Sequence, residues 1–106
     1  MTSVLMSMLM STSALASQAG SFDQAVDCTV TTAIMAATTT AAEQASYQGA
    51  NAYWAAAIFE AGTSAGMAAE AVGPYVEQAY QNRGSQYSTA PDGIRAIADV
   101  CVAQAG

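Results

Sequence analysis

The side chains that most often carry out catalysis are scarce in this sequence. Its 106 residues include no histidine and no lysine, so the usual general base and the usual amine nucleophile are missing. Asp23 and Asp27 are four residues apart, but they fall at the expected start of a helix, where carboxylates stabilise the helix dipole. The sequence contains no phosphate-binding loop, nucleophile motif or cluster of metal ligands. We therefore predict a protein that is not an enzyme and that uses no metal and no cofactor.

The charge of the chain argues against a nucleic-acid partner. The net charge is −6, and the basic side chains are those of Arg83 and Arg95. Binding to a nucleic acid requires clustered Lys and Arg side chains against the phosphate backbone, so we predict no nucleic-acid partner. We predict that the partner, if there is one, is another protein.

The two cysteines have the spacing of a structural disulfide. Cys28 and Cys101 are 73 residues apart, and neither belongs to a Cys-x-x-Cys redox motif. A bond between them would stabilise the fold by roughly 4.5 kcal/mol, because it reduces the conformational entropy of the unfolded chain. After residue 16 only twelve Leu, Ile, Val and Phe residues remain to build a core. We therefore predict that Cys28 and Cys101 are bonded, with Cα atoms about 5.5 Å apart.

The first sixteen residues differ in composition from all that follow. They contain all three leucines and no charged side chain, whereas the ten charged residues come later. An apolar run at 4–10 is followed by small residues that end at Ala16, which is the layout of a secretory signal peptide. We predict cleavage after Ala16, or after Ala19, and a single small domain over 17–106 that is exported to the periplasm or secreted. A membrane span is not predicted, because it needs about 20 apolar residues.

The pattern of apolar residues predicts an all-α fold. These residues recur at spacings of three and four, and no segment alternates like a strand. Ser21, Asn51 and Thr89 are placed to cap helix N-termini, while Gly49, Gly73 and Gly84 are placed to end helices. We predict a bundle of about four helices, at roughly 22–48, 52–72, 74–83 and 90–104, with a surface loop at 84–90.

Two further expectations concern the first and last of these helices. The first is apolar around most of its circumference, so we place it centrally, and we expect Thr38–Thr40 to bend it, since β-branched residues disfavour a straight helix. In the last helix Ile94, Ile97 and Cys101 share one face. We expect that face to pack against the N-terminal half of the first helix, near Ala25, Thr32 and Met35.

Five aromatic residues form the best candidate for a partner surface. Tyr53 and Trp54 are adjacent on a helix and therefore point about 100° apart, so one of them is expected at the rim of the bundle. Trp54 also falls on a predicted inner stripe with Ile58 and Val72. The candidate surface consists of Tyr53, Trp54, Phe59, Tyr75 and Tyr80.

These features predict a small exported structural or interaction protein. A signal peptide followed by a small helical domain with a cysteine near each end is loosely similar to small periplasmic acid-stress chaperones, although the lysines of those proteins have no counterpart here. The resemblance implies an alternative, a chaperone that opens when acid protonates the carboxylates. A further alternative is a membrane-inserting helical peptide, since Gly62 and Gly66 match the pattern of closely packed membrane helices.

Overall fold

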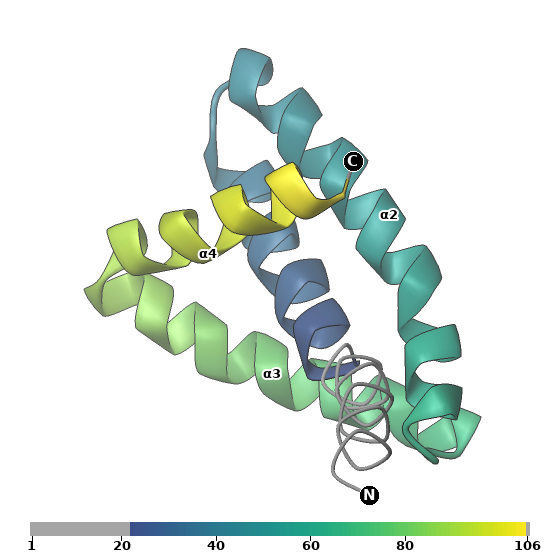
Figure 1. Cartoon of the computed structure of the whole chain (residues 1–106). Coiled ribbons are helices and arrows are strands. Elements are labelled where there is room, and N and C mark those ends of the chain that lie inside the picture. Colours follow the sequence, from purple (N-terminus) through teal and green to yellow (C-terminus); the bar gives the residue numbers. More distant parts are fainter. Residues whose placement is uncertain (1–21, 106) are drawn as a thin grey trace, which may run out of the picture.

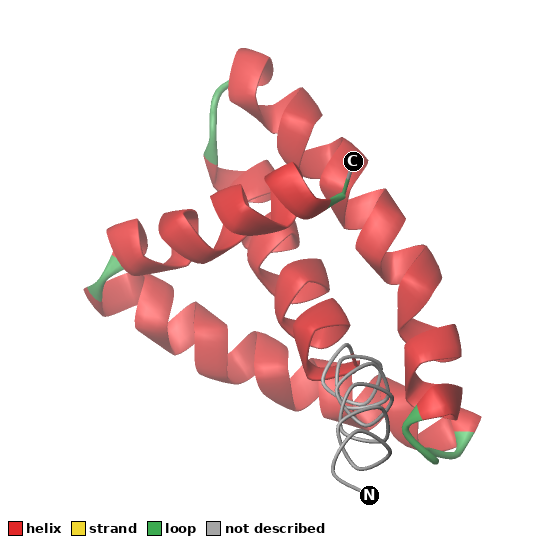
Figure 2. Ribbon diagram, viewed as in Figure 1, coloured by secondary structure: helices red, strands yellow, loops and turns green. Residues whose placement is uncertain are grey.

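The computed structural model describes residues 22–105, which form four helices and no strand (Figure 2). The first helix covers 22–38 and is called the central helix below. It is followed by α2 (Ala41–Ser64), α3 (Ala69–Thr89) and α4 (Pro91–Gln104). In Figure 1, α2, α3 and α4 form the sides of a triangle, and the central helix runs through its middle. The predicted all-α bundle of four helices is confirmed, while the predicted signal peptide and the predicted cap at Ser21 lie outside the described residues.

The central helix has buried side chains on most of its faces, which explains its position between the other helices. Its buried residues include two threonines, Thr31 and Thr32, which are both 0 % exposed. Their hydroxyls donate to the backbone carbonyls of Asp27, at 2.8 Å, and Cys28, at 2.5 Å. Because these polar groups bond within their own helix, they can be buried without a large desolvation cost. The buried apolar residues of this helix are Phe22, Ala25, Val26, Cys28, Val30, Ile34 and Met35.

The central helix ends at Thr38, within the run Thr38–Thr40 that was expected to bend a longer helix. The hydroxyls of Thr38 and Thr39 donate to the carbonyls of Ile34 and Met35, at 2.9 and 2.7 Å. Thr40 is extended, with φ −77° and ψ 166°, and α2 begins directly after it. The predicted helix over 22–48 is therefore wrong in its length. Threonine side chains that bond to the backbone of the preceding turn compete with a continuous helix, and here they end it.

The glycines predicted to end helices do not do so. Gly49 lies inside α2, and Gly73 and Gly84 lie inside α3, so the predicted boundaries at these positions and the predicted loop at 84–90 are wrong. A glycine inside a helix costs only about 1 kcal/mol relative to alanine, which a continuous helix can absorb. The glycine that does end a helix is Gly66, with φ +83°.

Gly66 closes α2 in a Schellman motif. Its N–H donates to the carbonyl of Thr63 at 3.0 Å, and the N–H of Met67 donates to the carbonyl of Gly62 at 2.8 Å. This pair of bonds satisfies carbonyls that would otherwise lack partners at the helix end, and it requires a left-handed residue that glycine adopts without strain. The chain then turns through 65–68 into α3.

Two other predicted caps have different roles, and Pro91 behaves as expected. Asn51 lies in the middle of α2, and its side-chain amide donates to the carbonyl of Thr29 on the central helix at 2.7 Å. Thr89 is the last residue of α3, and α4 has Ala90 at its N-cap with no side-chain cap bond. Ala90 precedes a proline, which disfavours the helical conformation and so separates α3 from α4. The predicted helix at 90–104 agrees with α4, which begins with Pro91.

Gly62 is the glycine that the packing itself requires. A Cβ atom at this position would lie 3.2 Å from the ring of Phe22 and 3.2 Å from a methyl group of Val72, and both neighbours are buried. At Gly49, on the same helix, a Cβ atom would meet nothing within 4 Å. Three helices therefore meet at Gly62, where the missing side chain allows them to approach.

We predict opposite effects of alanine at these two glycines. Gly62→Ala should lower the free energy of unfolding by about 1 kcal/mol, because overpacking outweighs the gain in helix propensity. Gly49→Ala should raise it by roughly 0.5–1 kcal/mol. Urea unfolding followed by circular dichroism at 222 nm measures both values. Equal stabilisation by the two substitutions would contradict the close contact at Gly62.

Candidate functional site

The predicted disulfide joins the central helix to α4. Cys28 and Cys101 are bonded, with Cα atoms 5.4 Å apart and both residues 2 % exposed. Ile94 and Cys101 are buried, as expected for the inner face of α4, while Ile97 is only partly buried. On the central helix Ala25, Thr32 and Met35 are likewise buried. The last helix is thus held against the central helix, as predicted.

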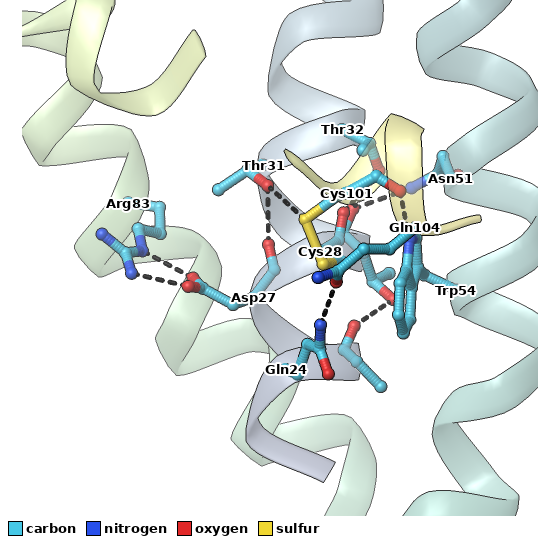
Figure 3. The surroundings of a disulfide bond; sticks show 12 residues. Gln24, Asp27, Cys28, Thr31, Thr32, Asn51, Trp54, Arg83, Cys101 and Gln104 are labelled. Atoms are coloured by element: carbon cyan, nitrogen blue, oxygen red, sulfur yellow. Dashed lines mark hydrogen bonds and ion pairs between the residues drawn. A yellow bond between two sulfur atoms is a disulfide. The ribbon is translucent and has the colours of Figure 1, made fainter. Parts of the chain in front are cut away.

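Polar groups from neighbouring helices surround the disulfide (Figure 3). The indole N–H of Trp54 donates to the carbonyl of Cys101 at 3.0 Å, and the hydroxyl of Thr31 lies 4.0 Å from the Cys101 sulfur. The side-chain amides of Gln24 and Gln104 are hydrogen-bonded beside it. Both cysteines are only 2 % exposed, which limits the access of solvent thiols to the sulfurs. This environment indicates a structural disulfide and not a redox centre.

The contacts between α3 and the central helix end on carboxylates. The guanidinium of Arg83 donates two hydrogen bonds to the carboxylate of Asp27, both at 2.7 Å. The phenol of Tyr75 donates to Asp23 at 2.9 Å, and its ring lies 5.1 Å from the ring of Phe22. The hydrogen bond to Asp23 raises the pKa of Tyr75. These contacts, together with buried Val72, attach α3 to the rest of the molecule.

The contacts between α2 and α4 follow the same pattern. The phenol of Tyr47, which is only 3 % exposed, donates to the carboxylate of Asp99 at 2.5 Å. Arg95 donates to Glu43 at 3.1 Å and approaches the Tyr47 oxygen at 3.4 Å. Burial, and then the hydrogen bond to Asp99, raise the pKa of Tyr47 to about 12. The bond to Glu43 raises the pKa of Arg95. Both arginines of the protein therefore join helices.

The five residues of the predicted aromatic surface do not all lie at the surface, because one of them is buried. Trp54 is 8 % exposed and lies in the core, so its assignment to a partner surface is wrong. Tyr53 is exposed beside it, with the two rings 5.0 Å apart, which confirms that one of this pair lies at the rim. Phe59 is 55 % exposed on α2, and Tyr75 and Tyr80 are 43 % and 42 % exposed on α3.

The outer side of α3 is the candidate functional site. Of its 21 residues only Val72 is buried. An open groove runs along this helix and is lined by Gly73, Val76, Glu77, Tyr80 and Gln81. Sequence reasoning identified Tyr80 but missed Gly73 and Glu77, because Gly73 was assigned to a helix end. The spacing 73, 77 and 80 places all three on one face of a helix that continues through the glycine.

Among residues 22–105, no group of three His, Cys, Asp or Glu residues could hold a metal ion, and no helix is long and apolar enough to cross a membrane. Comparison of the chain with protein-family models, curated proteins and solved structures finds no match. The geometry thus defines a small, disulfide-closed, all-α protein in which one helix, α3, lies largely exposed.

We predict that the disulfide supplies a large part of the stability. Replacing both Cys28 and Cys101 by alanine should lower the free energy of unfolding by about 4 kcal/mol, which corresponds to tens of degrees in melting temperature for so small a domain. Either single substitution should have a similar effect. Thermal unfolding with and without the disulfide measures the difference, and a shift of only a few degrees would contradict it.

Tyr47 predicts a loss of stability at alkaline pH. The folded protein favours the neutral phenol of Tyr47. The contribution of this phenol to the free energy of unfolding is therefore complete below pH 10, the pKa of tyrosine in the unfolded chain, and is lost as the pH rises toward about 12. The expected loss is on the order of 2 kcal/mol. Urea unfolding at pH 9 and pH 12 measures it. Tyr47→Phe should reduce this pH dependence, and so should Asp99→Asn, which removes the charged acceptor. An unchanged dependence in Tyr47→Phe would contradict the assignment.

Proposed function

We propose that this chain is a small exported, non-enzymatic interaction protein that binds another protein through the outer side of α3. The observation that carries the proposal is the exposure of α3, a 21-residue helix with one buried residue, on a scaffold closed by a disulfide. Export is supported by the disulfide, because such bonds persist in oxidising compartments. It is also supported by the composition of the first sixteen residues.

The side chains on α3 suit a protein contact. Tyr75 and Tyr80 are each a little over two-fifths exposed, and tyrosine is enriched in protein interfaces because its ring offers a large contact area with few rotatable bonds. The disulfide and the Arg83–Asp27 pair hold the neighbouring helices in place before a partner binds. A preorganised surface loses less conformational entropy on binding than a flexible one.

Site-specific crosslinking tests this proposal. A photoreactive phenylalanine analogue at Tyr80 should form a covalent adduct with one defined protein in the organism that produces the chain. The same analogue at Tyr53 is the matched control, because Tyr53 is a tyrosine of similar exposure on α2. Absence of an adduct at position 80, or an equal adduct at position 53, would contradict the assignment to α3.

An acid-responsive chaperone is the second candidate, and a specific observation favours it. Four side-chain contacts between helices end on Asp23, Asp27, Glu43 and Asp99, so all four depend on carboxylates, the groups on which the proposed acid response would act. The disulfide would still hold α4 on the central helix, whereas α3 has no covalent link to it. Acid would then release α3 first and uncover buried apolar residues such as Phe22 and Val72.

Circular dichroism from pH 7 to pH 2 separates the two candidates. A chaperone of this kind should lose the near-ultraviolet signal of Tyr75, whose ring packs against Phe22, while its far-ultraviolet helical signal persists, and it should then suppress aggregation of a denatured client protein. Asp27→Asn should shift the loss toward higher pH, because one of the contacts that hold α3 is already weakened. A near-ultraviolet signal that is retained at pH 2 would contradict the chaperone.

A further inference from the structure

We infer that the partner presents a basic segment and that one of its arginine side chains lies in the groove of Gly73, Val76, Glu77, Tyr80 and Gln81. This inference rests on the proposed function, since it assigns the chemistry of the partner at the same face of α3. It follows from the charge distribution on the described residues and from the chemistry of the side chains that line the groove.

Both arginines of the protein are already engaged. Arg83 binds Asp27 and Arg95 binds Glu43, and both contacts join helices. All ten charged side chains of the sequence lie within the described residues, so Glu77 has no lysine or arginine left to bind inside the molecule. Its exposed carboxylate therefore adds to the uncompensated part of a net charge of −6. Such a surface attracts cationic partners and raises their association rate.

The groove has the parts that an arginine side chain requires. Gly73 lies one turn before Glu77, and a Cβ atom there would meet nothing within 4 Å, so the backbone is open to close approach. Val76, which packs against the core, offers an apolar surface for the methylene groups of the side chain. The Glu77 carboxylate can accept charge-assisted hydrogen bonds from a guanidinium, and the ring of Tyr80 can stack on it. Arginine satisfies both contacts better than lysine, because its guanidinium is planar.

Charge also argues against the other occupants of this groove. A second copy of the chain also carries a net charge of −6, so its approach to this face is opposed by repulsion between like charges. A nucleic acid or an anionic lipid surface would be repelled for the same reason. A basic protein segment is the macromolecular partner whose charge complements this helix.

A peptide titration of the full chain, with its disulfide intact, tests the inference. The probe is a nine-residue peptide in which arginine alternates with leucine and glycine, and its twin carries citrulline in place of every arginine. Binding is followed by amide NMR shifts. We expect shifts concentrated at residues 73–81 and an affinity for the arginine peptide at least about tenfold above that for the citrulline peptide.

Matched variants separate a specific groove from general attraction. Glu77→Gln should weaken binding about fivefold, whereas Glu60→Gln, which removes the same charge from an exposed position on α2, should change it less than about twofold. Gly73→Ala should leave the fold at least as stable, because its Cβ atom meets nothing, yet it should weaken binding by narrowing the groove.

Several results would overturn the inference. These are equal effects of Glu77→Gln and Glu60→Gln, equal binding of the two peptides, shifts spread over all helices, or binding to phosphatidylglycerol vesicles in place of the arginine peptide. Failure of the inference is distinguishable from failure of the proposed function. An adduct at Tyr80 with a protein that has no basic residue at the contact would retain the interaction on α3 and exclude this partner class.

Discussion

The bond between Cys28 and Cys101 is the constraint on which the rest of the molecule depends, because it joins the most buried helix to the last one. The chain has few large apolar side chains, and alanines supply little burial each, so hydrophobic contacts alone leave a small margin of stability. Closing a loop of 73 residues reduces the entropy of the unfolded chain and widens that margin. The remaining helices can then be held by a few specific contacts.

Those contacts share one chemical feature. Four of the contacts that join two helices through charged or phenolic side chains have a carboxylate as the acceptor, as in Arg83 with Asp27 and Tyr47 with Asp99. In a protein of net charge −6, these bonds engage four of the eight acidic groups and both cations. The same arrangement therefore joins the helices through carboxylates and leaves the other four acidic side chains exposed on the surface. The two proposed functions arise from these shared properties.

The sequence predicted those features that are set by residues close together in the chain or by covalent bonding. The all-α class, a distortion of the helix at Thr38–Thr40, a last helix near 90–104 and the cysteine pairing were all predicted, although the distortion is a complete break and not a bend. Prediction from the sequence failed at Gly49, Gly73 and Gly84, because a glycine lowers helix propensity by only about 1 kcal/mol and does not by itself end a helix. Gly66 ends α2 because the turn into α3 requires a positive φ there.

The sequence by itself determined that this chain is helical, acidic and closed by one disulfide, because helix periodicity, charge and cysteine number are properties of the residues themselves. Only the tertiary structure decided that Trp54 is buried while Tyr53 is exposed, and that Glu77 and Tyr80 share a groove with Gly73. It also decided that Gly62 is needed for packing, since Phe22 and Val72 come from other helices. Such contacts join residues far apart in the chain, and no local pattern specifies which faces of separate helices will meet.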